Sequence, residues 1–159
     1  MNKLKYLGYS VVFQEVPGEV SLAINISGCP HRCEGCHSKY LWDYEGNYIS
    51  DDLEDLLEKY KGLITCVCFM GGDQNMSELL NLAFVAKKYN LKVALYSGVG
   101  NDVMSLVPLY NRFDYIKLGD YNKELGGLNK HTTNQRMYKN VNGMWEDITY
   151  KFWGKGLTQ

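Results

Sequence analysis

Short apolar runs that end at glycine recur along the chain and predict a series of buried strands. Residues 20–27, 63–70, 91–97 and 113–118 are rich in apolar and β-branched side chains, and a glycine follows each run directly. Nearly continuous apolar runs of this length suit strands buried on both faces. The aromatic tail beyond residue 140 predicts a further strand.

Segments between these runs carry apolar residues at helical spacing. A first helix is predicted after Ser50 as N-cap, with Gly62 as its stop. Its apolar face is formed by Leu53, Leu56, Leu57 and Tyr60. A second helix is predicted over residues 77–89 with Ser77 as its cap, and a shorter one around 101–110.

Strands that alternate with helices imply crossover connections and a mainly parallel sheet. Four to six strands are too few for a complete eight-fold barrel. We therefore predict an α/β fold, an open partial (β/α) barrel with a mainly parallel curved sheet, formed by residues 1–159 as a single domain. Ligands of such sheets bind beyond the carboxyl ends of the strands.

The composition of the chain argues against binding to nucleic acid or to a membrane. The 159 residues are 45% hydrophobic and 22% charged with a net charge of −1, so there is no electrostatic case for binding nucleic acid or a membrane surface. No apolar run reaches the roughly 18 residues that span a bilayer. The basic start of the chain is followed by neither a long apolar core nor a cleavage site, so a cytoplasmic protein is expected.

Three of the five cysteines lie within eight residues, at Cys29, Cys33 and Cys36, directly after the first predicted strand. A closed zinc site uses four ligands, and ordinary iron–sulfur clusters also take four cysteines. A 4Fe–4S cluster held by three cysteines keeps one iron free of protein ligands. That iron is then available to bind a small molecule.

These cysteines could also form a zinc site or a redox dithiol. A zinc site would need His31 or His37 as its fourth ligand, but His37 adjoins Cys36, and neighbouring residues rarely ligate one metal from a tight loop. A redox dithiol of Cys33 and Cys36 would leave Cys29 without a role. The remaining pair, Cys66 and Cys68, falls within an apolar run and is predicted to pack in the core.

The spacing Cys-x3-Cys-x2-Cys resembles the cluster motif of radical S-adenosylmethionine enzymes. Residues 27–37, followed by Trp42-Asp43 and Gly46, resemble more specifically the activating proteins of anaerobic (class III) ribonucleotide reductases. Downstream, residues 70–73 resemble the Gly-Gly-Asp motif of that family. Here Gln74-Asn75 follows in place of the family's Pro-Leu.

Weaker matches continue the resemblance at residues 95–98, 114–120 and 132–136. The resemblance implies two sets of site residues. The cluster ligands would be Cys29, Cys33 and Cys36. The S-adenosylmethionine contacts would be Gly35, Cys36 and His37 beside the cluster, and Gly71, Gly72 and Asp73 at the methionine amino group.

The implied activity is reductive cleavage of S-adenosylmethionine at a 4Fe–4S cluster, giving a 5′-deoxyadenosyl radical. The implied partners are the large subunit of anaerobic ribonucleotide reductase, which would receive a glycyl radical, and a flavodoxin-type electron donor. One alternative is an activator of another glycyl-radical enzyme, such as pyruvate formate-lyase. An alternative of a different class is a zinc-binding interaction module without catalysis.

Metal content separates the cluster from the zinc module. Protein purified without oxygen is expected to be brown and to hold about four irons per chain, because three thiolates and one open position suit a 4Fe–4S cluster. The measurement is elemental analysis together with the visible spectrum. A colourless protein with stoichiometric zinc would contradict the cluster and favour the interaction module.

Overall fold

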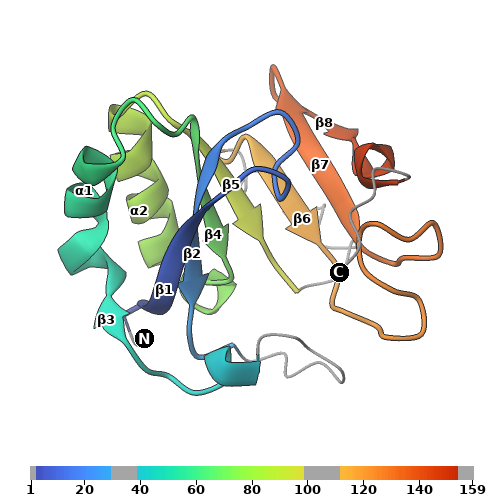
Figure 1. The fold of residues 1–159 in the computed structure, drawn as a ribbon, viewed down its shortest axis with the longest axis horizontal. Helices are drawn as coiled ribbons and strands as arrows, with labels where there is room; N and C mark the ends of the chain where they lie inside the picture. The colour runs from blue at the N-terminus through green and yellow to red at the C-terminus, as the bar shows by residue number, and fades with distance from the viewer. Residues whose placement is uncertain (1–2, 30–38, 99–111, 154–159) are drawn as a thin grey trace.

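A computed structural model describes residues 3–29, 39–98 and 112–153 of the chain. Its strands form one sheet in the order β3-β1-β2-β4-β5-β6-β7-β8 (Figure 1). The strands are β1 (Lys5–Val12), β2 (Ser21–Ile26), β3 (Asn47–Tyr48), β4 (Cys66–Met70), β5 (Lys92–Tyr96), β6 (Tyr115–Leu118), β7 (Arg136–Val141) and β8 (Met144–Asp147). The α-helices of the described part are α1 (Ile49–Lys59) and α2 (Met76–Lys88), with 3-10 turns η1 (Lys39–Leu41), η2 (Asp73–Asn75) and η4 (Thr149–Phe152).

The four strands predicted from the apolar runs are confirmed. They are β2, β4, β5 and β6, which lie next to one another and pair in parallel. The tail beyond residue 140 also supplies a strand, β8. The predicted helix around 101–110 lies outside the described residues.

The predicted mainly parallel partial barrel is wrong. Of the seven strand pairings, three are parallel and four are antiparallel, and the described residues contain two α-helices beside eight strands. The prediction failed because it followed continuous apolar runs, which mark strands buried on both faces. Strands β1 and β7 are only partly buried and carry polar residues, and β1 also contains a glycine, so they lack that pattern.

Both helices begin earlier than predicted. Ser50 lies inside α1, whose first turn has no side-chain cap. Helix α2 begins at Met76, and the cap is Asn75 rather than Ser77: its side-chain oxygen accepts the backbone N–H of Glu78 at 3.2 Å. An Asn followed three residues later by Glu is a capping pattern, so the sequence did contain this signal.

Successive side chains of the parallel strands point to opposite faces of the sheet, so the core has two parts. Phe69, Leu95 and Ile116 face α1 and α2, together with the leucines of those helices. Cys68 and Tyr115 face the opposite side, where the β1–β2 connection and η4 cover the sheet. Neither α-helix in the described part is long and apolar enough to cross a membrane.

A buried carboxylate ties together the amino-terminal ends of the parallel strands. Glu19 accepts hydrogen bonds from Thr65 Oγ1 at 2.7 Å, Tyr115 Oη at 2.9 Å and Lys92 Nζ at 3.1 Å. Burial raises the pKa of Glu19, but these three donors outweigh burial and hold the pKa below its usual value of 4.5. The carboxylate is thus stabilised in its charged form.

We expect Glu19→Gln to lower the free energy of unfolding at pH 7 by about 1–3 kcal/mol, because it removes hydrogen bonds to a charged group. A carboxyl group whose folded pKa is depressed contributes stability above its unfolded pKa, and that stability is lost as pH falls through the folded pKa. The difference in unfolding free energy between the variant and the unmodified protein should therefore shrink below pH 4.5. Urea denaturation over a pH series measures it.

Glu146→Gln is the matched control, since Glu146 lies exposed on β8 and should leave stability unchanged. A Glu19→Gln protein as stable as the unmodified protein at pH 7 would contradict the assignment. A loss of unfolding free energy in Glu19→Gln that stays constant as the pH falls below 4.5 would also contradict it.

Candidate functional site

The segments predicted to carry the chemistry meet at one edge of the sheet. Parallel strands end on the same side, and β2, β4, β5 and β6 deliver their following residues there. A cavity of about 190 Å³ lies at this edge. Its lining includes Cys29, Gly71, Gly72, Asp73, Ser97 and Lys117.

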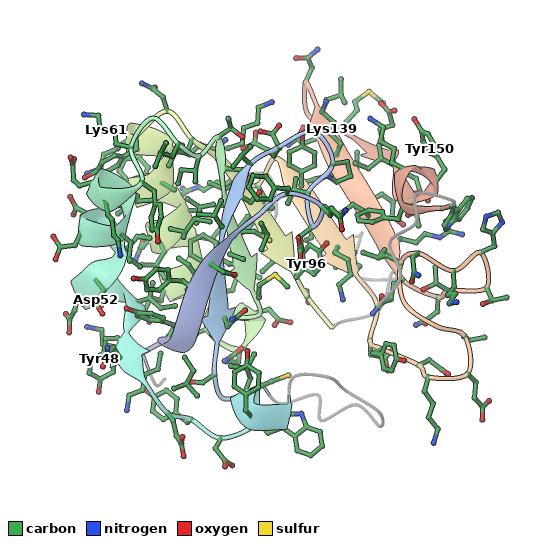
Figure 2. All side chains as sticks on the ribbon, viewed as in Figure 1. Tyr48, Asp52, Lys61, Tyr96, Lys139 and Tyr150 are labelled. Atoms are coloured by element: carbon green, nitrogen blue, oxygen red, sulfur yellow. The ribbon has the colours of Figure 1, made fainter. Side chains whose placement is uncertain are left out.

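One cross-strand row of four side chains faces the cavity. Asn25 pairs with Met70, Met70 with Tyr96, and Tyr96 with Lys117. All four line the cavity (Tyr96 is labelled in Figure 2). The row therefore presents an amide, a thioether, an aromatic ring and an ammonium side by side, at strand spacings of about 4.8 Å.

The row beneath carries small side chains on β2, β4 and β5 and continues with Tyr115 on β6. Ala23 pairs with Cys68, and Cys68 with Ala94; all three are almost completely buried. Because side chains alternate along a strand, these residues lie on the same face of the sheet as the cavity, two positions further back. Their small volume leaves room in front of them for the larger side chains of the row.

The prediction that Cys66 and Cys68 pack in the core is confirmed. Both are fully buried, and Cys68 Sγ lies 3.5 Å from Met70 Sδ. Burial raises the pKa of Cys66 to about 12 and that of Cys68 well above its usual value. These groups are therefore neutral thiols, whereas metals bind thiolates.

Two glycines form the turn after β4. Gly71 and Gly72 have φ angles of 104° and 103°, in the region that favours glycine. A Cβ atom on Gly72 would lie 2.8 Å from Ile26 Cδ1 and 3.2 Å from Leu79 Cδ1. The turn thus passes close against the core and brings Asp73 into the cavity wall.

Asp73 is oriented by a residue of the next strand end. Ser97 Oγ donates a hydrogen bond to Asp73 Oδ2 at 2.9 Å, and Ser97 is 1% exposed. The backbone N–H of Ser97 donates to the carbonyl of Lys117 at 2.8 Å. Ser97 therefore connects the acidic turn after β4 with the end of β6.

The departure from the family pattern at Gln74-Asn75 has a structural role. Gln74 Nε2 donates to the carbonyl of Ser27 at 3.2 Å, which links the glycine turn to the start of the cysteine loop. Asn75 caps α2. Sequence patterns do not show the Gln74 contact, because it joins residues 47 positions apart.

The base of the cysteine loop is closed by hydrogen bonds. The N–H of Gly28 donates to the carbonyl of Asp43 at 3.1 Å, and that of Cys29 to the carbonyl of Leu41 at 2.9 Å. Ser27 Oγ donates to the carbonyl of Glu45 at 2.5 Å. The chain segments 27–29 and 41–45, on either side of the loop, are therefore held together.

Gly46, part of the family resemblance, lies in a crowded position. A Cβ atom there would come within 1.9 Å of the carbonyl oxygen of Tyr6, and its φ angle is 106°. No other residue type fits this backbone. The glycine lets the returning segment pass directly against β1.

Only one predicted cluster ligand, Cys29, belongs to the described residues; Cys33, Gly35, Cys36 and His37 lie outside them. Within residues 3–29, 39–98 and 112–153, no group of three His, Cys, Asp or Glu side chains could hold a metal. Cys29 is partly exposed and lines the cavity with Asp73. One cavity is thus lined by a thiol, which suits the predicted cluster, and by a carboxylate, which suits the predicted amino group.

A larger cavity of about 530 Å³ adjoins the first. The two share Met70, Tyr96, Tyr121 and Gln135 as lining residues. The larger one is further lined by residues 126–130, Glu15 and Phe152. The polar glycine-rich segment and the aromatic tail thus form a wall beside the predicted site.

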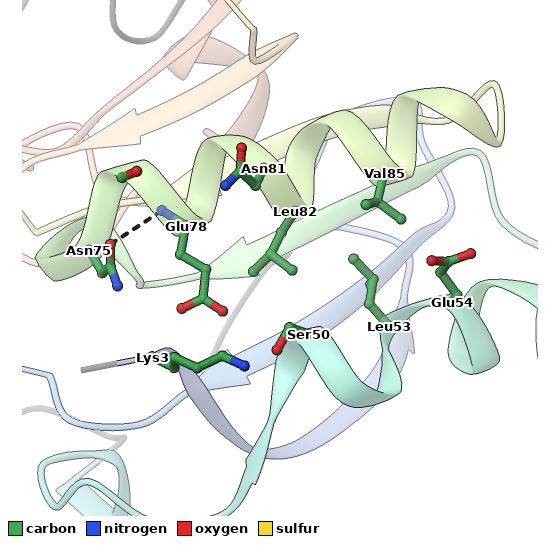
Figure 3. A pocket seen from close by; sticks show the side chains of 10 residues that line it. Lys3, Ser50, Leu53, Glu54, Asn75, Glu78, Asn81, Leu82 and Val85 are labelled. Atoms are coloured by element: carbon green, nitrogen blue, oxygen red, sulfur yellow. Dashed lines mark hydrogen bonds between the residues drawn. The ribbon is translucent and has the colours of Figure 1, made fainter. Parts of the chain in front are cut away.

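Another cavity of about 530 Å³ lies between α1 and α2, away from the cysteine loop (Figure 3). Glu78, one of its two acidic lining residues, accepts the backbone N–H of Leu4 at 2.7 Å, which fixes the start of β1 to α2. The cavity holds none of the residues predicted to act in chemistry. We interpret it as a groove between packed helices.

Comparisons with known proteins support the resemblance predicted from the sequence. A family model described as "4Fe-4S single cluster domain" matches residues 16–139. The anaerobic ribonucleoside-triphosphate reductase-activating protein of Enterobacteria phage T4 is 27% identical over 149 residues, covering 87% of this chain and 95% of the phage protein. The predicted resemblance is confirmed. No solved structure matches the chain significantly.

The two glycines of the turn should differ in their tolerance of alanine. Both have positive φ, so each substitution should cost about 1–2 kcal/mol of stability. Gly72→Ala should cost about 1–3 kcal/mol more, because its Cβ meets buried side chains, whereas a Cβ on Gly71 has its nearest neighbour at 3.7 Å. Chemical denaturation of the two variants measures this, and equal stabilities would contradict the close packing at Gly72.

Proposed function

This chain belongs to the 4Fe-4S single cluster domain family, and from that premise we propose that Cys29, Cys33 and Cys36 hold a 4Fe–4S cluster at the sheet edge. The buried thiols Cys66 and Cys68 are poor competitors for iron, since burial keeps them protonated. Three ligands leave one iron open. Because Cys29 lines the cavity, a cluster held by these cysteines would lie beside the space for a small-molecule ligand.

We further propose that the cavity binds S-adenosylmethionine. Gly71 and Gly72 let the backbone approach the methionine end, and the carboxylate of Asp73 pairs with its amino group. Ser97 holds that carboxylate in place by its hydrogen bond. His37 and Gly35, which flank the third cysteine, are proposed to contact the adenosyl part.

The cluster, when bound and reduced, supplies one electron that cleaves S-adenosylmethionine into methionine and a 5′-deoxyadenosyl radical. The protein binds and orients the substrate and excludes water. The radical then removes a hydrogen atom from a glycine Cα, giving 5′-deoxyadenosine and a glycyl radical.

The target glycine must reach the cavity as part of another protein. The adjoining larger cavity provides a route, because it shares Tyr96 and Gln135 with the site and is walled by the glycine-rich segment 126–130. We propose that the partner is the large subunit of anaerobic ribonucleotide reductase and that a flavodoxin-type protein donates the electron, in the cytoplasm. The phage relative, named as an activator of such a reductase, supports this choice over pyruvate formate-lyase.

One observation carries this proposal. Cys29, the first residue of the three-cysteine motif, lines the same cavity as the Gly71-Gly72-Asp73 turn, although the two are more than 40 residues apart in the chain. A zinc-binding module has no need of an oriented carboxylate beside its cysteines. A cluster with an open iron that binds an amino acid substrate does need one.

Matched cysteine variants test the chemistry. Cys29→Ser should abolish reductive formation of 5′-deoxyadenosine, because it removes a cluster ligand. Cys66→Ser, a change of the same type in the core, should retain it. The measurement is 5′-deoxyadenosine formed from S-adenosylmethionine with a chemical reductant under anaerobic conditions.

Full activity of Cys29→Ser would contradict the cluster assignment. The partner is tested by adding candidate glycyl-radical proteins and recording electron paramagnetic resonance. A doublet signal is expected with the anaerobic reductase. A signal only with pyruvate formate-lyase would identify the alternative activator, and none with any candidate would reject activation.

A further inference from the structure

A further cavity extends the route that leads away from the predicted site. It has a volume of about 520 Å³ and is lined by the β1–β2 connection and η4. It shares Gln14 and Phe152 with the cavity of about 530 Å³ beside the site, and that cavity shares Tyr96 and Gln135 with the site itself. The three cavities are therefore continuous. We call the two outer ones together the outer groove.

Two exposed aromatic side chains line the far end of the outer groove. Phe13 is 68% exposed and Tyr150 is 54% exposed, and both line the cavity of about 520 Å³ (Tyr150 is labelled in Figure 2). Single exposed apolar residues are common on protein surfaces. Two aromatic residues at one cavity are a different case, because aromatic side chains that a partner buries carry much of the binding energy of protein interfaces.

The segments on both sides of this cavity are anchored in the core. Val16 of the β1–β2 connection is fully buried, and the carbonyl of Glu15 before it accepts a hydrogen bond from Tyr96 Oη. Phe152 of η4 is 5% exposed. The backbone that carries the exposed aromatic residues is therefore fixed, which lowers the entropic cost of binding a partner there.

The lining of the outer groove has an excess of positive charge. It includes Lys123, Lys130 and Lys151, and among the described residues that line it Glu15 is the one acidic residue. The chain as a whole has a net charge of −1, so this excess is local. A segment that carries carboxylates is complementary to it.

We propose that the outer groove binds an extended acidic segment of the glycyl-radical partner, with an apolar side chain of that segment packed against Phe13 and Tyr150. The inference rests on the proposed function, which requires a glycine within a protein chain to reach the site. Small-molecule sites measure about 300–1,000 Å³, and each outer cavity alone has such a size. Two of them in succession suit a polypeptide segment.

The two aromatic residues belong to this chain rather than to the family pattern. The family model matches residues 16–139, and Phe13 and Tyr150 lie outside that range on either side. The outer groove therefore joins the shared site to residues that the family match does not account for. Such residues can set which partner the protein selects.

Formation of the glycyl radical on added reductase large subunit tests the outer groove. The growth of the electron paramagnetic resonance doublet is recorded at increasing reductase concentration, with S-adenosylmethionine and a chemical reductant. Phe13→Ser and Tyr150→Ser should each raise the reductase concentration that gives half the maximal rate about 5- to 30-fold, because an aromatic anchor is lost. The rate at saturating reductase should stay unchanged. So should the 5′-deoxyadenosine formed without reductase, because neither residue lines the site.

Phe84→Ser is the matched control. Phe84 is 57% exposed on α2 and lines neither the site nor the outer groove, so its loss should leave every reading unchanged. For the charge, Lys151→Glu should also raise the half-maximal concentration, whereas Lys139→Glu, outside the outer groove, should not. Phe13 and Tyr150 lie on separate segments, so a folding defect in one variant leaves the other to carry the test.

The remaining outcomes separate the inference from the proposed function. Half-maximal concentrations that stay unchanged in both aromatic variants would show that the outer groove does not bind the partner. A fall in 5′-deoxyadenosine formed without reductase would show that these residues shape the site instead, and a dimer in sedimentation that the variants dissociate would show that a second copy covers this face; either result overturns the inference. If the unmodified protein forms no 5′-deoxyadenosine at all, the proposed function fails first, and this inference fails with it.

Discussion

The parallel register of β2, β4, β5 and β6 is the constraint on which the site depends. It places the side chains of Asn25, Met70, Tyr96 and Lys117 in one row along the cavity. The small residues Ala23, Cys68 and Ala94 lie in the row behind. Because side chains alternate along a strand, a shift of one residue in any pairing would exchange the cavity side chains of that strand for core residues. The buried carboxylate of Glu19 ties the opposite ends of these strands and so supports the same register.

The sequence could predict the central strands because each is a compact apolar run that ends at glycine. It could not predict the antiparallel flanks, because β1 and β7 are partly exposed and their polar residues hide the strand pattern. The meeting of Cys29 with Gly71-Gly72-Asp73 was predictable, since parallel strands end at one edge. The contacts of Gln74 and Ser97 were not predictable, since each joins distant segments of the chain.

Burial gives the three cysteines of the described residues different chemistry. Cys66 and Cys68 are held as neutral thiols inside the sheet, where they act as small apolar side chains. Cys29 is partly exposed where the chain leaves the sheet. Exposure as well as position in the sequence therefore separates Cys29 from the buried pair Cys66 and Cys68.

The closed base of the cysteine loop has a consequence for chain entropy. Hydrogen bonds from Ser27, Gly28 and Cys29 to residues 41–45 join the two ends of the loop within the protein itself. The entropic cost of closing a loop grows with its length, and here the fold has already met the cost of joining the ends. If Cys29, Cys33 and Cys36 hold a cluster as proposed, the free energy of cluster binding is therefore not spent on joining the ends of their loop.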